Sequence, residues 1–260
     1  MECDRTLGEV VYFAAPMGTT PASPLIHLDQ LIARYCTPKW QELLRKQNTR
    51  LEFGKGEAIF ASGQKAEHMF MVHRGRVKVV VHQPGGKARI IRLAGDGEVL
   101  GHRAIGDEPT YAASAIALTP TTVNVIPMEL FLSTLQANNL FCYHFLLYFA
   151  AEMRVLDQQQ RDLMEMEVAQ RVAQVLLLCQ STFGMDRERP TVLAYTLPRR
   201  DIASMADTSY ESVIRALSDL QQQGIIELVG KEVRIRKGKT LERMVSGRKS
   251  IPRASNRPSS

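Results

Sequence analysis

The apolar positions of the chain change their spacing near residue 50 and again near residue 128. From residue 25 to about residue 47 they recur with helical spacing, and Thr37-Pro38 marks the expected start of a helix. Between the two changes, short β-rich runs alternate with turns, and 10 of the 17 glycines lie between positions 54 and 106. Many short strands with regularly spaced turns predict an antiparallel sandwich or barrel. The expected strands are 58–60, 69–72, 77–82, 89–93, 112–117 and 121–126.

Helix-forming residues dominate from residue 128 to about residue 166. Apolar side chains recur there at alternating steps of four and three, which is the pattern of a coiled-coil seam. A helix packed on its own β domain would look similar, but the seam extends past that domain, so we favour a homodimer helix. Gln160 is the polar seam position, where it could fix the register. The seam residues are Cys142, Leu146, Phe149, Met153, Leu156, Gln160 and Leu163.

Two short helical runs follow each other near the C-terminus. Their apolar positions are Ile202, Ala203 and Ala206, then Val213, Ile214 and Leu217. The residues between them, 207–209 (Asp-Thr-Ser), favour turns and helix N-caps. Two helices joined by such a turn form a helix-turn-helix, whose second helix enters a DNA major groove. We expect an amphipathic helix over 167–179 and a β run over 192–197 before it, and a hairpin turning at 230–231 after it, as a wing.

The formal charge of +6 is confined to this same region. Residues 1–198 hold 20 Lys/Arg and 20 Asp/Glu, whereas residues 199–260 hold 13 and 7. A solvated basic tail would explain the charge by itself. Its coincidence with the helix-turn-helix favours neutralisation of phosphates and predicts double-stranded DNA as a partner.

Export and membrane insertion are not indicated. The N-terminus carries Glu2 and Asp4 without a long apolar core, and the most apolar run, 140–151, is too short to cross a bilayer. The cysteines form no C-x-x-C pair, which argues against a zinc knuckle or a disulfide framework. They are Cys3, Cys36, Cys142 and Cys179. We expect a cytoplasmic protein with reduced thiols and no membrane partner.

The order of these elements resembles the Crp/Fnr superfamily of bacterial transcription regulators over residues 25–236. The segments that carry the resemblance are 53–63 (FGKGEAIFASG), 69–79 (MFMVHRGRVKV), 167–173 (EVAQRVA), 200–217 (RDIASMADTSYESVIRAL), 224–226 (GII) and 230–231 (GK). The resemblance implies a homodimer on a palindromic operator, RNA polymerase as a further partner, and no catalytic residues.

The expected fold class is α+β, with an N-terminal antiparallel β-roll like a cyclic-nucleotide-binding jelly roll, a long dimerisation helix and a C-terminal winged helix-turn-helix. The expected boundaries are a flexible arm over 1–24, a β-roll effector-type domain over 25–135, the dimerisation helix over 136–166, the DNA-binding domain over 167–237 and a disordered basic tail over 238–260.

The resemblance assigns the base contacts to Glu211 and Arg215, which lie one helical turn apart. Arg215 would donate two hydrogen bonds to guanine, and Glu211 would accept one from cytosine N4. An intrahelical salt bridge between them is compatible with this role. Tyr210 stands where cyclic-AMP-responsive members carry another Arg, which alters the outer part of the site. The other expected DNA contacts are Arg200, Thr208, Ser209, Ser212, Ile214 and Lys231.

The resemblance also places an effector pocket in the β-roll, at Gly101, His102, Arg103, Ala113 and Ser114. His102 stands where the family has its acidic ribose ligand, and Ala113 where it has the Arg that binds the cyclic phosphate. Arg103 is offset by one position and is expected to face the other way on a strand. Without the guanidinium the pocket loses its charge complement to a phosphate. The sequence therefore argues against cyclic AMP as the effector.

Other effectors have less support. An iron–sulfur cluster needs grouped thiolates, and only Cys3 and Cys36 precede the β-roll. A haem would depend on His82 or His102, and lone histidines are more often ordinary polar residues. Cys142 could be a thiol sensor, although a seam cysteine is more often a small apolar residue. We expect no cofactor and a constitutive DNA binder.

Two alternatives remain open. In the first, the β-roll binds an unidentified small molecule or cofactor that switches DNA binding. In the second, the β-barrel is a cupin-like metal oxygenase, which requires paired histidines and a carboxylate on facing strands. The histidines of the barrel lack H-x-H spacing, which disfavours the enzyme. They are His68, His73, His82 and His102.

Overall fold

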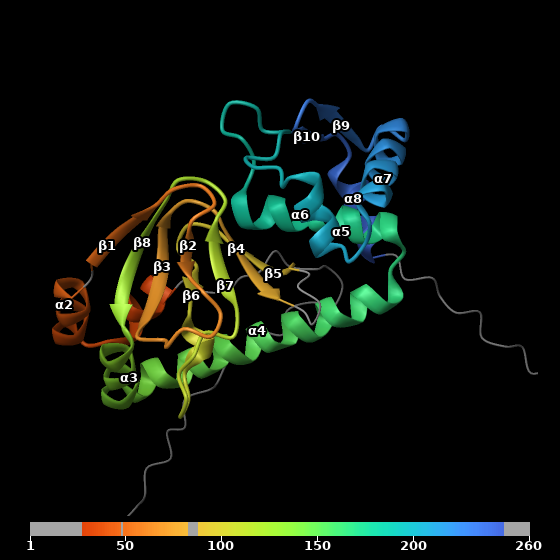
Figure 1. Cartoon of the computed structure of the whole chain (residues 1–260). Helices are drawn as coiled ribbons and strands as arrows, with labels where there is room; N and C mark the ends of the chain where they lie inside the picture. Colours follow the sequence, from red (N-terminus) through yellow and green to blue (C-terminus); the bar gives the residue numbers. More distant parts are fainter. Residues whose placement is uncertain (1–27, 48, 83–87, 247–260) are drawn as a thin grey trace, which may run out of the picture.

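The computed structural model describes residues 28–47, 49–82 and 88–246. Within these ranges the chain forms an N-terminal β-roll, a long helix along one side of it, and a C-terminal helical domain with a hairpin (Figure 1). This is the expected α+β architecture. The proposed arm over 1–24 and residues 247–260 of the proposed tail lie outside the described residues.

Two four-stranded antiparallel sheets form the β-roll. The strands are β1 (Thr49–Phe53), β2 (Ala58–Phe60), β3 (His68–Arg74), β4 (Val77–His82), β5 (Ala88–Ala94), β6 (Val99–Leu100), β7 (Ser114–Ala117) and β8 (Thr121–Pro127). One sheet has the order β1-β8-β3-β6 and the other β2-β7-β4-β5. Alternate side chains such as Met69, Val77 and Val123 are fully buried in the core of the roll. All six expected strands are present, whereas β1 and β6 are additional.

Four helices flank the roll. They are α1 (Leu28–Tyr35), α2 (Pro38–Lys46), α3 (Met128–Ala137) and α4 (Asn139–Glu165). Pro38 occupies the first turn of α2, where its missing N–H has no intrahelical acceptor. The N-terminal half of α4 buries Phe141, Phe145 and Tyr148 in the same core as the roll. This half of α4 is therefore fixed to the roll by apolar burial.

The C-terminal domain contains four helices and one hairpin. They are α5 (Val168–Phe183), α6 (Arg199–Met205), α7 (Tyr210–Gln222), β9 (Ile226–Val229), β10 (Glu232–Ile235) and α8 (Gly238–Ser246). A capping box between Glu167 and Gln170 starts α5. The fully buried side chains of Val172, Leu176 and Ile202 hold α5 and α6 together.

Two sequence expectations in this domain are wrong. Residues 238–246 are not part of a disordered tail but form α8, because Leu241 and Val245 are buried against the core around α5. Residues 192–197 are not a strand. Only Val192 and Leu193 form isolated bridges, to Arg234 and Met185.

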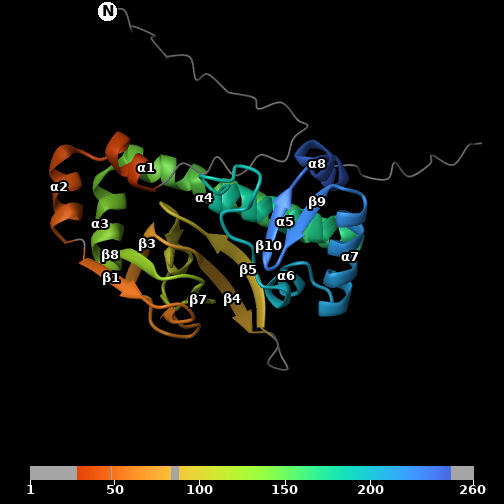
Figure 2. The same cartoon turned by 90° about the horizontal axis from the view of Figure 1, so that it is seen from above.

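The C-terminal domain packs directly on the roll. In both views α6 lies beside the edge strand β5 (Figures 1 and 2). The Ser204 hydroxyl accepts a hydrogen bond from the Ile90 amide at 3.0 Å and donates one to the Ala88 carbonyl at 3.2 Å. Lys78 Nζ lies 3.0 Å from both carboxylate oxygens of Asp201. Side chains of β4 and β5 thus share one apolar cluster with α5, α6 and α7.

Candidate nucleic-acid interface and effector region

The helix-turn-helix is formed by α6 and α7 with a turn at residues 206–209. Asp207 has φ 47°, the left-handed conformation that Asp adopts more readily than most residues. The Ser209 hydroxyl caps α7 by accepting a hydrogen bond from the Ser212 amide at 3.1 Å. The buried face of α7 carries Val213 and Leu217. The sequence prediction of the turn and its cap is confirmed.

The opposite face of α7 lies in solvent. Tyr210 and Ile214 are 47% and 42% exposed. Glu211 and Arg215 are also exposed, one turn apart on the same face. Hydrogen bonds from its own backbone amide and from Ser209, with the charge of Arg215, lower the pKa of Glu211. The face therefore presents an anionic acceptor beside a guanidinium donor.

Arg171 of α5 fixes the position of the turn. Its Nε donates to the Ala206 carbonyl at 2.8 Å, and Nη1 donates to the Met166 carbonyl at 2.8 Å. These carbonyls lie just beyond the ends of α6 and α4, where helices leave acceptors unsatisfied. One guanidinium thus connects the end of the long helix to the turn before α7.

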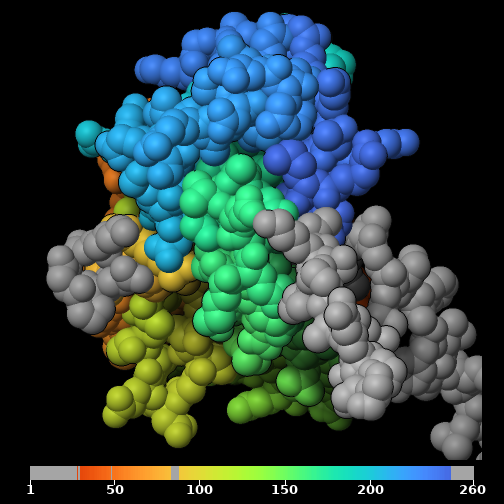
Figure 3. Space-filling view, turned by 90° about the vertical axis from the view of Figure 1, so that its right-hand side faces the viewer, coloured from red at the N-terminus to blue at the C-terminus, as the bar shows by residue number. Residues whose placement is uncertain are grey.

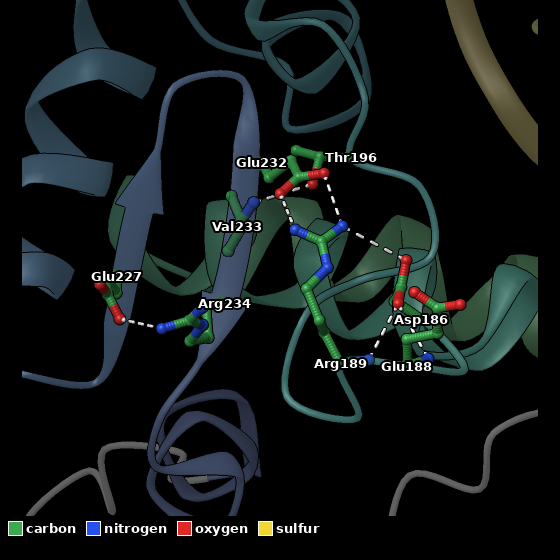
Figure 4. A network of polar contacts seen from close by, with 8 residues as sticks. All are labelled: Asp186, Glu188, Arg189, Thr196, Glu227, Glu232, Val233 and Arg234. Atoms are coloured by element: carbon green, nitrogen blue, oxygen red, sulfur yellow. Dashed lines mark hydrogen bonds and ion pairs between the residues drawn. The ribbon is translucent and has the colours of Figure 1, made fainter.

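The wing is held by ion pairs along β10 (Figure 4). The two terminal nitrogens of the Arg189 guanidinium, Nη1 and Nη2, donate to the Glu232 carboxylate at 2.7 and 2.9 Å, and Arg189 also contacts Asp186 at 3.3 Å. Arg234 contacts Glu227 across the hairpin at 3.1 Å. The Arg189–Glu232 pair ties the loop after α5 to the wing. Lys231, at the turn of the hairpin, is exposed.

The remaining predicted DNA contacts lie around α7. Arg200 is exposed on α6, and Thr208 and Ser212 are half-buried beside the turn. Thr208 donates its backbone N–H to the Ala203 carbonyl at 3.0 Å, which closes the turn after α6. The structure thus brings the predicted residues to the α6–α7 unit and the wing tip.

Two of the predicted effector residues, His102 and Arg103, lie between the roll and α4. Residues 102–104 form a 3-10 turn, so the expectation that Arg103 faces away on a strand is wrong. His102 is 1% exposed, and its Nε2 lies 2.6 Å from a carboxylate oxygen of Glu152 on α4. Arg103 Nε lies 3.4 Å from the same oxygen. Both side chains therefore face α4.

The other pocket residues have structural contacts. Gly101 has φ +82°, and a Cβ there would lie 3.1 Å from the Tyr111 ring and 3.2 Å from the His68 carbonyl. Ser114 is buried, and its hydroxyl accepts a hydrogen bond from the Ser62 amide at 3.0 Å. Ala113 is partly buried against the core of the roll. Its side chain is a methyl group and offers no charge to a ligand.

Two family models match the chain in the expected order. A cyclic nucleotide-binding domain matches residues 50–138, and a Crp-like helix-turn-helix domain matches residues 170–244. The chain belongs to the Crp/Fnr family. It is a Crp-like transcription regulator with a DNA-binding helix-turn-helix.

Relatives of this Crp/Fnr protein match along most of its length. It is 25% identical to the CRP-like cAMP-activated global transcriptional regulator of Mycobacterium tuberculosis, over 83% of this chain and 99% of the relative. It is 27% identical to the cyclic AMP receptor protein of Thermus thermophilus, over 86% and 98%. FixK2 from Bradyrhizobium japonicum shares the fold, with a TM-score of 0.68 and 23% identity over 76% of this chain and 96% of that one.

The seam of this Crp/Fnr protein is only partly covered within the single chain. Cys142, Leu146, Met153 and Gln160 are exposed, and Leu146 reaches 63%. Phe149, Leu156 and Leu163 are half-buried. Phe149 packs edge-on against the His102 ring, with centroids 5.9 Å apart. Part of the predicted seam thus contacts the roll, and part faces solvent.

The sequence analysis of this Crp/Fnr protein missed three residues that position its effector region and its DNA-binding domain. They are Glu152, Arg171 and Ser204. Glu152 is one of several polar residues on α4, and spacing alone does not say which of them is buried. Arg171 lies in a segment that carried the resemblance, but its carbonyl partners are distant in sequence. The sequence places Ser204 on α6, but nothing in it indicates that its hydroxyl bonds to β5.

The described part of the chain was also compared with what a metal site and a membrane-spanning helix require. Within residues 28–47, 49–82 and 88–246, no three His, Cys, Asp or Glu side chains are grouped as metal ligands. His82 lies exposed at the end of β4, apart from His102. In the same part of the chain, no helix combines the length and apolar character needed to cross a membrane.

Proposed function

We propose that this Crp/Fnr protein binds a palindromic operator as a homodimer and does so without cyclic AMP. The observation that carries the proposal is the solvent-exposed pair Glu211–Arg215 beside the capped start of α7. A helix of this kind reads three or four base edges with its first turns. Glu211 is the acceptor and Arg215 the donor that together distinguish a C·G pair.

A dimer is supported by the apolar surface left on α4. Leu146 and Met153 are 63% and 54% exposed and lie seven residues apart, as seam residues of a two-stranded coiled coil do. In Figure 3 the blue C-terminal segments lie above the green surface around the α4–α5 junction. Two copies joined along α4 would carry two α7 helices, which suits two half-sites one helical turn apart.

Independence from cyclic AMP is supported by the pocket. Ala113 offers no charge to a phosphate, and His102 is already bonded to Glu152. We infer a regulator that works in the cytoplasm with RNA polymerase as a partner and has no catalytic activity, cofactor or membrane partner.

Selection of binding sites from random double-stranded DNA tests the proposal. We expect a palindromic consensus that is the same with and without cyclic AMP. Light scattering of the complex should give two chains for each duplex. A consensus recovered only with cyclic AMP, or a single half-site bound by one chain, would contradict the proposal.

The alternative of a small-molecule switch is favoured by a cleft of about 820 Å³ between the roll and the end of α5. Arg74, Asp96 and Thr122 of the roll line it, together with Thr182 and Phe183 of α5. A molecule bound there would touch both domains. Repeating the selection with a metabolite extract, and finding a changed consensus or affinity, would support this alternative.

A further inference from the structure

Glu152 is a buried carboxylate on the face of α4 that packs against the roll. Its side chain is 4% exposed. His102 Nε2 lies 2.6 Å from one carboxylate oxygen, and Arg103 Nε lies 3.4 Å from the same oxygen. Arg92 of β5 lies 3.5 Å from the other oxygen. Three basic side chains of the roll thus converge on one acidic side chain of the helix.

A buried charge without a partner is strongly unfavourable, so this cluster is stable only as a set. Arg92 also contacts Glu98 at 3.1 Å and donates to the Val99 carbonyl at 2.8 Å, which holds it within the roll. Arg103 is 33% exposed. If Glu152 were absent, the positive charge of Arg103 would face α4 without the carboxylate that now lies beside it.

The protonation states favour a fixed contact. Burial lowers the pKa of His102 despite the nearby carboxylate, so the ring is neutral and donates its Nε2 proton. The Nδ1 atom of His102 is buried, and no described residue bonds to it. Burial by itself would raise the pKa of Glu152. The hydrogen bond from His102 and the charges of Arg92 and Arg103 outweigh it and hold that pKa well below its usual range.

We propose that Glu152 is a built-in carboxylate ligand for the cationic site formed by Arg92, His102 and Arg103. In this role the chain supplies the anion that holds α4 on the roll, and no small molecule is needed to place the helix. This inference rests on the proposed function, because it explains how a regulator binds DNA without an effector.

Chemical rescue tests the proposal in the full-length protein. The Glu152→Ala substitution removes the equivalent of one acetate ion beside the exposed edge of Arg103. Because it removes the carboxylate that Arg92, His102 and Arg103 share, we expect the melting temperature to fall by roughly 10 °C. Sodium acetate should restore at least half of that loss, and sodium chloride at equal ionic strength should not. DNA affinity should fall and recover in parallel.

Asp157→Ala is the matched control, since Asp157 is an exposed carboxylate on the same helix. It should melt like the wild type and respond equally to acetate and chloride. An undiminished melting temperature for Glu152→Ala, or equal effects of the two salts on it, would overturn the proposal. So would a rise in the wild-type melting temperature on adding cyclic AMP.

Glu152→Gln covers the case in which the alanine variant does not fold. It keeps the shape of the side chain and removes the charge, so it should melt below the wild type and ignore acetate. If it is as stable as the wild type, the proposal is wrong. Melting requires no DNA. If the wild type selected no operator, the proposed function would be refuted. The melting temperatures of the Glu152 variants would still decide whether Glu152 is the built-in ligand.

Discussion

Arg215 has a role that can be tested apart from the rest of the DNA-binding surface. The Arg215→Ala substitution should remove about 1–3 kcal/mol of discrimination at one base pair of each half-site and leave salt-sensitive, non-specific binding in place. Competition between the selected operator and a scrambled duplex measures this. Arg243→Ala, which removes an exposed arginine of α8, should keep the preference. Unchanged selectivity of the Arg215 variant would exclude it as a base contact.

The His102–Glu152 pair makes stability depend on pH. The pKa of His102 is lowered in the fold, so the unfolded chain gains a proton first as the pH falls through the ordinary histidine value of about 6.5. The pKa of Glu152 is also lowered, and its contribution is lost below the ordinary glutamate value of about 4.3. The melting temperature should therefore decline in two steps on acidification.

His102→Gln serves as the control for the first step. It offers an N–H to Glu152 but does not titrate. The decline near the histidine value should become smaller in this variant, whereas the decline at lower pH should remain. An identical pH profile for the two proteins would show that His102 is not the group responsible.

At the scale of elements, α8 stabilises the DNA-binding domain although it makes no predicted base contact. Leu241 is fully buried against the core around α5, and Gln170 of α5 donates a hydrogen bond to the Met244 carbonyl at 2.8 Å. Leu241→Ala should reduce the free energy of unfolding by about 2–5 kcal/mol. Chemical denaturation measures it, with the exposed Glu242→Ala as the control. A loss below 1 kcal/mol would mean that α8 is not docked in solution.

The spacing of apolar residues along the chain predicted most of the strands and helices. It failed where contact with a segment distant in sequence determines whether a residue is buried. The bounds of β2 and β4 match the expected runs, and Asp207 lies in the expected turn before α7. The strand β6 was missed because two residues give no period. The helix α8 was missed because its two buried residues lie in a basic sequence, and only the surface of α5 makes them apolar contacts. Glu152 was missed for the same reason.

At the scale of the whole molecule, the contact between α6 and the roll fixes the DNA-binding domain. Lys78 and Asp201 are 21% and 18% exposed, so their ion pair is screened less than a surface pair. A double-mutant cycle with Lys78→Met and Asp201→Asn should give a coupling free energy of about 1 kcal/mol or more. The exposed pair Lys46–Glu42 is the control and should give a few tenths. Equal coupling in the two cycles would mean that the domains are not held together by this contact.

Ser204 has a consequence for the fate of the roll when it is separated from the rest of the chain. β5 is an edge strand, and the serine hydroxyl satisfies its Ile90 amide and its Ala88 carbonyl. A fragment that ends before α5 would leave those groups free and would also uncover Val80 and Leu93, which share an apolar cluster with α5 and α6. Open apolar strand edges template strand addition between molecules. The DNA-binding domain therefore also protects the β-roll from self-association through its edge strand.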